Sequence, residues 1–435
     1  MTREGDIAAL AVRPHRIGVE ADAAKWWAAL LDALAEIGTE GVRGIAIGGF
    51  TRSQVLVDAA GVPVRPAQCF PDGRADPVPG AEAGTWMAMT AFHPAARLAW
   101  VARHDPAALA QARYVLQPAD FLSFQLTRRA ASDRIANCWA IDRQGAATTG
   151  PLRRAGVSEA LLPELLAPGA ALGTARDVAG LAGVPVFQGS MDTWVASLGA
   201  GVGRPEDAYL IAGTTDAGGV LTASPAERPG LVTLPWGDGV FHTGGPSAAG
   251  GACLEWAARL LRLADTAAVI ALAQTAGEAP PLLFIPALIG SRAPYWRAEA
   301  RGALLGLDMA HGPAEIARAV LEGIACADRD LFGGLDFDRL VIAGGGARAD
   351  FACQVRADVL GRPVHRVAGE PGLAGAAVLA WVGLGVYASV AEAQAVMCRP
   401  DRVFLPCVSA RHERLYSAFA RAQEASSLLT DSHDR

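Results

Sequence analysis

Apolar and polar positions along the chain follow two periods, one typical of helices and one typical of strands. In residues 22–34 the apolar side chains recur at helical spacing, and a strand-like run follows at residues 42–47. That run ends at Gly48 and Gly49, and residues 54–64 then have the apolar runs and central Ala-Gly turn of a hairpin. A helix, a buried strand and a hairpin in this order predict a mixed α/β sheet.

The rest of the chain repeats these patterns. Helices are predicted at residues 94–103, 118–126, 159–166, 251–264, 313–330, 349–360 and 373–383. Strands are predicted at residues 184–187, 207–212, 282–286 and 339–343, and loops at residues 77–84 and 140–151. Because both halves contain similar strands and helices, we predict two related α/β domains, residues 1–197 and 198–435, with a ligand-binding cleft between them.

Composition narrows the class of protein. Hydrophobic residues make up 51% and charged residues 19% of the 435 positions, which is enough for a large core. The net charge of -6 argues against nucleic acid as a partner, because a phosphate backbone requires a basic face. Lys25 is the only lysine in the sequence and no P-loop string occurs, so a bound phosphate would meet backbone N–H groups, arginine or a metal.

Cysteine usage and the N-terminus bear on the cellular compartment. The seven cysteines are scattered and form no C-x-x-C pair, so neither a zinc site nor a disulfide framework is predicted. The first residues lack the apolar core of a signal peptide, and we expect a cytoplasmic protein. Residues 371–391 carry no charge, but their Ala and Gly content predicts a buried helix rather than a membrane span.

A lone acidic residue, Asp192, lies among small residues directly after the predicted strand at residues 184–187. A carboxylate at such a junction can accept a proton from a substrate hydroxyl. Aspartate is equally suited to capping the N-terminus of a helix. The local sequence leaves both interpretations open.

Two glycine-containing turns have residue types that bind phosphate. The first follows a predicted strand, and its backbone N–H groups and hydroxyls can surround phosphate oxygens, although many hairpins look similar. The second joins a strand to a helix, where a nucleotide can approach the backbone and the helix N-terminus favours negative charge, although a tight turn is an equal alternative. The residues are Gly213, Thr214 and Thr215 in the first turn and Gly344, Gly345 and Gly346 in the second.

Several strings, taken together, resemble one protein family. Residues 291–307 form an aromatic loop ahead of an amphipathic helix, which by itself predicts only core packing. With Glu315, Ala319 and Glu322 in that helix, the segment is similar to the C-terminal signature of the FGGY carbohydrate kinases. Residues 92–100 resemble the N-terminal signature of that family, with Arg97 in place of its usual lysine.

A third string supports the resemblance. Residues 70–74, Phe-Pro-Asp-Gly-Arg, look like the W-x-D-x-R string of the family with phenylalanine replacing tryptophan. The likeness extends from about Gly5 to about Val408. It implies two ribonuclease-H-like domains of the actin-like ATPase (sugar kinase) fold, an N-terminal sugar-binding domain and a C-terminal nucleotide-binding domain, which close around a sugar and ATP.

The resemblance also implies roles for individual residues. Asp192 would be the general base, and no metal-ligating residue is assigned, although Mg²⁺ is implied together with ATP. Thr51 and Arg52 would contact the acceptor, while Arg52 as a surface ion-pair partner is the alternative. Weaker candidates for the same acceptor pocket are Asp72, Phe92 and Thr193. The nucleotide-side residues would be Gly213, Thr214, Thr215, Gly250, Gly251, Gly344, Gly345 and Gly346.

The implied substrate is a small sugar or polyol. Glycerol kinase has an arginine where this chain has Arg52, and xylulokinase has a histidine there, but residues 50–54 match neither in full. A pentulose such as xylulose is favoured, and a polyol such as glycerol and a deoxy-ketose stay open. A homodimer is possible by resemblance, and no membrane partner is expected.

One departure concerns the start of the sequence. Family members open with a strand and a D-x-G-T turn near the metal, and no such string occurs upstream of Trp26. We expect either that translation starts further upstream and the protein is active, which we favour, or that this is a truncated pseudokinase. The remaining alternative is an actin-like ATPase that acts as a sugar-binding or regulatory protein.

Overall fold

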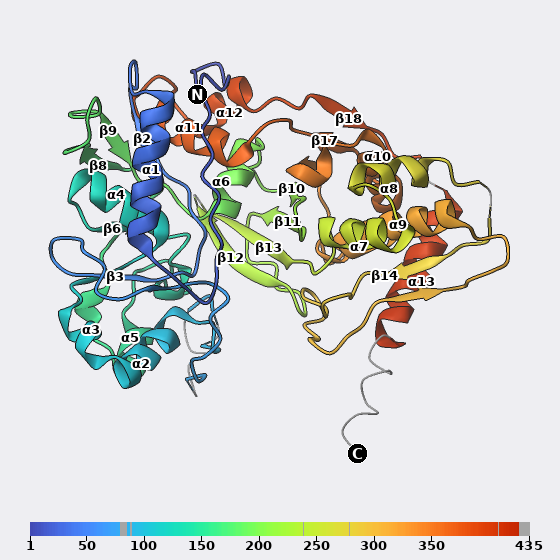
Figure 1. Cartoon of the computed structure of the whole chain (residues 1–435), viewed down its shortest axis with the longest axis horizontal. Coiled ribbons are helices and arrows are strands. Elements are labelled where there is room, and N and C mark those ends of the chain that lie inside the picture. The colour runs from blue at the N-terminus through green and yellow to red at the C-terminus, as the bar shows by residue number, and fades with distance from the viewer. Residues whose placement is uncertain (79–84, 88, 238, 278, 408, 426–435) are drawn as a thin grey trace. The chain divides into compact units, whose positions relative to one another are not determined.

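The computed structural model describes residues 1–78, 85–87, 89–237, 239–277, 279–407 and 409–425 (Figure 1). The chain divides into two compact units, each with helices packed on short β-sheets. The first unit comprises Met1–Gly199 and Gly372–Cys398, and the second comprises Ala200–Pro371 and Arg399–Arg435. Most of the loop predicted at residues 77–84 lies outside the described residues.

The first unit is built around a three-stranded sheet of order β2-β9-β8. The strands are β2 (Ile45–Ala46), β9 (Pro185–Phe187) and β8 (Ala171–Thr174), with β2 parallel to β9. Just beyond β9, a side chain at Gly189 would place its Cβ 1.7 Å from the Ile47 carbonyl oxygen, so only glycine fits this close approach. Glycine at position 189 therefore allows the backbone after β9 to pack directly against the backbone after β2.

Helices of the first unit begin at favourable residues. Asp22 caps α1 (Ala23–Ile37) by accepting the Ala24 N–H at 3.0 Å. The helices α2 (Pro94–His104), α3 (Pro106–Gln111), α4 (Pro118–Thr127) and α5 (Gly150–Arg154) each carry proline in the first turn, where its missing N–H costs nothing. The remaining strand pairs are β1 (Glu20–Ala21) with β4 (Ala67–Gln68), β3 (Val55–Val57) with β5 (Tyr114–Leu116), and β6 (Ala131–Asp133) with β7 (Glu164–Leu166).

The helix predicted at residues 159–166 is wrong. The structure has a single 3₁₀ turn at Glu159–Leu161 followed by β7. Pro163 explains the difference, because proline has no N–H to donate and its ring clashes with the preceding helical turn. The apolar spacing was compatible with a helix, but this proline ends any helix before it can form a second turn.

The uncharged stretch after residue 371 returns to the first unit. It forms α11 (Pro371–Gly383) and leads to α12 (Val390–Met397), whose Gln394 Nε2 donates to the Leu198 carbonyl at 2.8 Å. A Cβ at Gly375 would lie 1.9 Å from the Val195 carbonyl oxygen, so glycine permits tight packing against α6 (Asp192–Gly199). The helix predicted at residues 373–383 agrees with α11, which is buried on one side only, and the helix does not continue over residues 384–389. The chain passes from the first unit to the second between Gly199 and Ala200, and residues 372–398 belong to the first unit. No helix among the described residues is long and apolar enough to cross a membrane.

The second unit contains a seven-stranded sheet of order β12-β13-β11-β10-β16-β17-β18. Its first four strands pair antiparallel, β10, β16 and β17 pair parallel, and β18 is antiparallel. The strands are β10 (Asp207–Ile211), β11 (Ala217–Thr222), β12 (Val232–Gly237), β13 (Val240–Pro246), β16 (Arg339–Ala343), β17 (Val364–Arg366) and β18 (Arg402–Phe404). Because β10 and β16 are parallel neighbours, their carboxyl ends meet at one edge of the sheet.

Helices of the second unit pack together beside this sheet (Figure 1). They are α7 (Gly251–Leu261), α8 (Thr266–Gln274), α9 (Pro313–Asp330), α10 (Asp350–Leu360) and α13 (Ala410–Ala425). A small hairpin, β14 (Leu283–Ile285) with β15 (Ala303–Leu305), joins their apolar core, in which Phe284 and Ile324 are each 1% exposed. The prediction for α9 agrees at both ends, because Pro313 starts it and the Glu315 carboxylate accepts the Gly312 N–H at 2.9 Å.

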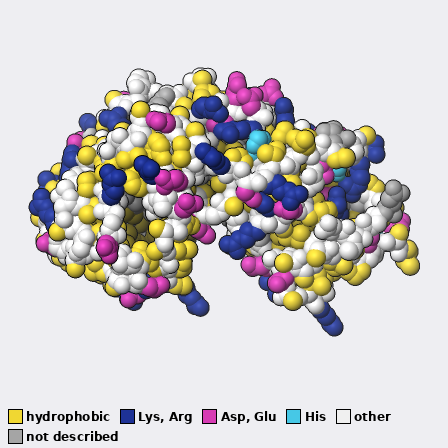
Figure 2. Space-filling view, turned by 90° about the horizontal axis from the view of Figure 1, so that it is seen from above, with side chains coloured by type: hydrophobic (Ala, Val, Ile, Leu, Met, Phe, Trp, Pro, Cys, Tyr) yellow, Lys and Arg dark blue, Asp and Glu magenta, His cyan; other side chains and the backbone are white. Residues whose placement is uncertain are grey.

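Charged side chains are mixed on the surface. Figure 2 shows Lys and Arg side chains interspersed with Asp, Glu and hydrophobic side chains on the face that it presents. This face therefore carries charged side chains of both signs.

Candidate active site

Asp192 lies in the first unit, at the first residue of α6. Its backbone N–H donates to the Gly49 carbonyl at 2.8 Å, and the Gly49 N–H donates to the Ser190 carbonyl at 3.2 Å. These bonds extend the pairing of β2 and β9 by one parallel bridge between Gly49 and Met191. The backbone of Asp192 is therefore held at a strand-to-helix junction against Gly49, which precedes the predicted acceptor residue Thr51 by two positions.

The Asp192 carboxylate is solvent-accessible, and its surroundings still change its acidity. Its Oδ1 accepts the Thr193 N–H at 2.7 Å and the Thr193 hydroxyl at 3.3 Å. Desolvation by the surrounding protein nevertheless raises the pKa of Asp192 above its ordinary value, because it outweighs both hydrogen bonds. The side chain bonds its own first turn, as a helix cap does, and it is also an accessible carboxylate with raised proton affinity. The two interpretations of Asp192, helix cap and general base, are therefore compatible with each other in this structure.

A buried polar layer supports the strand that leads to Asp192. The Ser190 hydroxyl donates to the Asp133 carboxylate at 2.7 Å, and the Gln188 amide donates to the Asp120 carboxylate at 2.9 Å. Ser132 also donates to Asp120, which further accepts the Gln117 N–H at 3.2 Å. Both carboxylates are 1% exposed. The end of β9 is therefore fixed by side-chain bonds on alternate residues.

The acidity of these two buried carboxyl groups is strongly perturbed. Burial, together with the nearby Asp133 charge, raises the pKa of Asp120 to about 7. Burial also raises the pKa of Asp133 to about 6, although two backbone N–H groups and Ser190 stabilise its anion. The pair therefore titrates near neutral pH, which sequence reasoning did not predict.

Thr51 and Arg52 lie in the loop between β2 and β3. Arg52 has φ 57°, a left-handed conformation that residues with a Cβ seldom adopt. The Thr51 hydroxyl oxygen is buried and has no hydrogen-bond partner among the described residues. An unpaired buried hydroxyl beside a strained residue is typical of a loop that is shaped for a ligand.

The three weaker candidates for the acceptor pocket differ in their exposure to solvent. Asp72 is 0% exposed, and its carboxylate oxygens accept from the Arg74 guanidinium at 2.9 and 2.8 Å and from Gln68 at 3.2 Å. Phe92 is 49% exposed, and Thr193 is part-buried beside Asp192. Any effect of Asp72 on a bound acceptor is therefore indirect, because its carboxylate is already used inside the protein.

In the second unit, the structure brings the first glycine turn against the start of α7. The Gly251 N–H donates to the Gly213 carbonyl at 2.8 Å, and the Ala252 N–H donates to the Thr214 carbonyl at 2.9 Å. A Cβ at Gly251 would lie 2.8 Å from that Gly213 oxygen, and Gly250 has φ 142°, so both positions favour glycine. Thr214 is exposed and Thr215 is part-buried. Gly213, Thr214, Thr215, Gly250 and Gly251 thus form one surface.

The second glycine turn joins this surface from the neighbouring strand. Because β10 and β16 are parallel, the Ala212 N–H donates to the Ala343 carbonyl at 2.8 Å, and the Gly346 N–H donates to the Ala212 carbonyl at 3.0 Å. Gly344 has φ 98°, and Gly345 is exposed. All eight predicted nucleotide-side residues therefore gather at the carboxyl ends of β10 and β16, where α/β sheets usually bind ligands.

A buried ionic group braces this edge, and sequence reasoning missed it. Arg356 on α10 donates to the Asp216 carboxylate at 2.8 Å and to the Asp328 carboxylate on α9 at 2.8 Å. Asp216 also accepts the Gly213 N–H at 3.1 Å, and its oxygen would lie 2.8 Å from a Cβ at Gly250. Burial raises the pKa of both carboxyl groups, and that of Asp328 rises well above the ordinary value. The sequence signal that could have indicated a buried Arg356 is its position among the regularly spaced apolar residues of α10.

The aromatic loop and α9 serve packing, as their pattern predicts. The Glu322 carboxylate, 1% exposed, accepts both Arg411 nitrogens at 2.7 and 2.9 Å and Arg318 at 2.8 Å. Tyr295 donates to Asp330 at 2.8 Å. These bonds join the loop, α9 and α13.

The described residues contain no group of three or more His, Cys, Asp or Glu side chains that could hold a metal ion. The only acidic group beside the glycine turns that the bonds above identify is Asp216, which is already paired with Arg356. A divalent ion at these turns would therefore take most of its oxygen ligands from a bound nucleotide and from water, as Mg²⁺ commonly does.

Comparison with known proteins gives consistent matches. Residues 5–199 match the profile described as "FGGY family of carbohydrate kinases, N-terminal domain", and residues 208–384 match the profile of the C-terminal domain. Xylulose kinase of Escherichia coli (strain K12) is 31% identical over 410 residues, covering 87% of this chain and 85% of that protein. Glycerol kinase of Aromatoleum aromaticum (strain DSM 19018 / LMG 30748 / EbN1) is 31% identical over 385 residues, covering 81% and 75%.

Solved structures give the same result for the fold. The crystal structure of xylulose kinase from Rhodospirillum rubrum matches with a TM-score of 0.82 and 28% identity, covering 93% of this chain and 90% of that chain. The predicted fold class, a two-domain α/β sugar-kinase fold of the actin-like ATPase architecture, is confirmed by this match and by the two family profiles.

Proposed function

The chain belongs to the FGGY family of carbohydrate kinases, which are phosphotransferases, and from this premise we propose that it phosphorylates a hydroxyl of a small sugar or polyol with ATP. In the proposed reaction, the acceptor hydroxyl oxygen attacks the γ-phosphorus of ATP. A new O–P bond forms, the bond from the γ-phosphorus to the bridging oxygen breaks, and ADP leaves. The hydroxyl proton goes to the Asp192 carboxylate.

The position and acidity of Asp192 carry this proposal. The carboxylate is accessible at a strand-to-helix junction, and desolvation raises its pKa. A carboxylate with raised pKa binds a proton more readily than an ordinary aspartate, which suits a general base that works near neutral pH. The buried layer of Ser190, Asp133 and Gln188 supports it by fixing the backbone on which it stands.

The edge formed by the two glycine turns supports ATP as the phosphoryl donor. In this proposal the backbone of Gly213–Thr215 and of Gly344–Gly346 lies against the phosphates, with the Thr214 and Thr215 hydroxyls as added donors. The N-terminus of α7, an 11-residue helix, adds a partial positive charge beside the first turn. Mg²⁺ would enter with the nucleotide as MgATP and neutralise part of the phosphate charge.

Xylulose is the acceptor that we favour. The Escherichia coli relative that is 31% identical over most of both chains is a xylulose kinase, and glycerol kinases match at a similar level. The unpaired Thr51 hydroxyl supports recognition of a polyhydroxylated ligand, because such a group can bond to a sugar hydroxyl. Glycerol is the second acceptor to compare.

The test is acceptor-dependent release of ADP, measured with xylulose, glycerol and other small sugars and polyols. We expect one of these acceptors to be phosphorylated, and Asp192→Ala to lower kcat by roughly 10²-fold or more while the Tm stays close to that of the parent. Asp76→Ala, which changes a 74% exposed aspartate of the same unit, is the matched control and should keep full activity. Turnover by Asp192→Ala near the parental rate would contradict the assignment of the base.

A further inference from the structure

Arg97 on α2 is buried in the first unit, and its exposed fraction is only 1%. Its three guanidinium nitrogens all donate to backbone carbonyl groups: Nε to Asp72 at 2.9 Å, Nη2 to Phe70 at 2.8 Å and Nη1 to Arg52. Burial lowers the pKa of Arg97 to about 10, which still leaves it charged at neutral pH. A buried cation that bonds only to carbonyl groups fixes main-chain positions instead of neutralising a carboxylate.

The three carbonyl groups belong to two loops that lie side by side. Residues 49–53 carry Thr51 and Arg52, and residues 69–74 carry Asp72. The loops are joined where Gln54 and Gln68 exchange backbone hydrogen bonds of 2.8 and 3.0 Å. The Ser53 hydroxyl, 0% exposed, accepts the Phe70 N–H at 3.0 Å and makes a second link. Arg97 therefore spans both loops, and its bond to the Arg52 carbonyl is directly next to Thr51.

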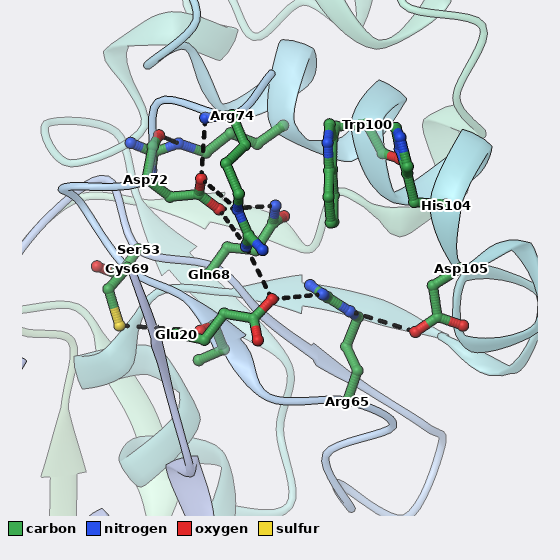
Figure 3. A network of polar contacts seen from close by, with 12 residues as sticks. Glu20, Ser53, Arg65, Gln68, Cys69, Asp72, Arg74, Trp100, His104 and Asp105 are labelled. Carbon is green, nitrogen blue, oxygen red and sulfur yellow. Dashed lines mark hydrogen bonds and ion pairs between the residues drawn. The ribbon is translucent and has the colours of Figure 1, made fainter. Parts of the chain in front are cut away.

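The far side of the second loop is fixed by an ionic network (Figure 3). The Arg74 guanidinium donates to both carboxylate oxygens of Asp72 and to the Glu20 carboxylate at 2.8 Å. Glu20 also accepts a hydrogen bond from Arg65 at 3.0 Å. The Arg74 guanidinium lies 4.4 Å from the centre of the Trp100 ring, which stands on the same helix as Arg97. Figure 3 shows Arg74 and Arg65 directed toward Glu20 from two segments. The loop of Asp72 is thus rigid and can serve as an anchor for its neighbour.

We propose that Arg97 is a positioning residue for acceptor recognition, which holds the Thr51–Arg52 loop against the anchored Asp72 loop. The left-handed conformation of Arg52 is the one in which its carbonyl group reaches the Arg97 guanidinium. Removal of this bond would free the loop to leave that strained conformation. The acceptor contacts would then change, whereas the glycine turns of the second unit would not.

The shape of the guanidinium group explains why arginine is needed in this chain. Its planar fork presents several N–H donors at fixed and separate positions, so three carbonyl groups in different loops can be bound at once. A lysine ammonium presents its donors from one atom and cannot span the same three groups. Arg97→Lys therefore keeps the charge and most of the burial but loses the bridge.

This inference rests on the proposed kinase function, and its test keeps the two apart. We would measure the KM of the acceptor, the KM of ATP, kcat and the Tm for Arg97→Lys, Arg97→Met and Ser53→Ala. We expect Arg97→Lys to raise the acceptor KM roughly tenfold and the ATP KM less than about twofold. Arg97→Met should raise the acceptor KM more than Arg97→Lys does, and Ser53→Ala should raise it less. Arg103→Met, on the exposed side of the same helix, is the matched control and should change neither KM.

Several outcomes would overturn the proposal. Equal changes in both KM values, or a lower Tm with both KM values at the parental level, would show that Arg97 contributes only to the stability of the fold. If both Arg97 variants fail to fold, Ser53→Ala decides, and an unchanged acceptor KM in that variant would contradict the proposal. Acceptor-dependent turnover by Asp192→Ala near the parental rate would instead contradict the assignment of the base, and the two KM values of the Arg97 variants would still decide the role of Arg97.

Discussion

At the scale of single residues, buried carboxyl groups connect the acidity of the site to the stability of the fold. Asp120 and Asp133 bond to the segment that joins β9 to Asp192, and burial raises the pKa of both. For a carboxyl group whose pKa is higher in the folded state, the folded protein binds more protons than the unfolded chain. Its contribution to stability is therefore lost as the pH rises through the folded-state pKa.

Asp120→Asn should for this reason stabilise the protein at high pH. The folded-state pKa of Asp120 is about 7 and the unfolded value is about 3.9, so the penalty for its ionisation develops between pH 4 and pH 7. The Gln188 amide oxygen has no partner among the described residues, and rotation of this amide would accept the new N–H group. We expect the Tm of Asp120→Asn, relative to the parent, to rise by a few degrees between pH 5 and pH 8.

The control for this measurement is Asp177→Asn, which changes a 73% exposed aspartate of the same unit and should give a pH-independent difference. A Tm difference for Asp120→Asn that is the same at pH 5 and pH 8 would show that Asp120 is ionised in the folded protein across this range.

Residue-level prediction from the sequence succeeded for small local patterns and failed for buried charges. The two glycine turns were recognisable because each follows a strand directly, and the structure places them together. Arg356 and Asp216 were not recognised, because their partners lie 140 positions apart along the chain and no local pattern connects them. The apolar spacing around Arg356 indicates that this side chain is buried, but it does not indicate which carboxylates pair with it.

At the scale of elements, α10 and α9 hold the first glycine turn through Arg356. The same arginine binds two carboxylates, but only Asp216 also bonds to Gly213 and lies against Gly250. Asp216→Asn should therefore loosen the nucleotide turns, whereas Asp328→Asn should not. The same substitution, aspartate to asparagine, can therefore be compared at positions 216 and 328.

We expect Asp216→Asn to raise the KM of ATP roughly tenfold with less than about a twofold change in the KM of the acceptor. Asp328→Asn should leave the KM of ATP within about twofold of the parent, because the Asp328 side chain bonds to Arg356 on α10 and not to the first glycine turn. Steady-state kinetics with both substrates varied measures both effects. Equal increases for the two variants would contradict a specific role for Asp216.

Most elements were predictable where their start signals are local. Pro313 and Glu315 fix the start of α9, and the helix agrees with its prediction over 18 residues. The apolar spacing of residues 159–166 is compatible with a helix, but Pro163 prevents one from forming, so the helix predicted there is wrong. Short strands such as β2 were predicted too long, since strand length depends on a pairing partner elsewhere in the chain.

At the scale of the whole molecule, the two-domain sugar-kinase fold could be predicted from the family resemblance, but its chain path could not. Residues 372–398 return to the first unit after the seven-stranded sheet of the second is almost complete. The reason is tertiary packing, in which Gly375 fits against Val195 and Gly383 fits against Phe187. The uncharged composition of residues 371–391 indicated a buried helix and gave no sign of the surface that buries it.

The central claim is that Asp192 accepts the proton of an acceptor hydroxyl during phosphoryl transfer from ATP. Phosphorus-31 NMR of the full chain with MgATP and xylulose, or the acceptor found active in the screen, tests it most directly. For the parent protein we predict a sugar phosphate ester that appears in equal amounts with ADP, and for Asp192→Asn an initial rate lower by roughly 10²-fold or more. Ester formation by Asp192→Asn at the parental rate would contradict the account, and so would release of ADP together with free phosphate and without any ester.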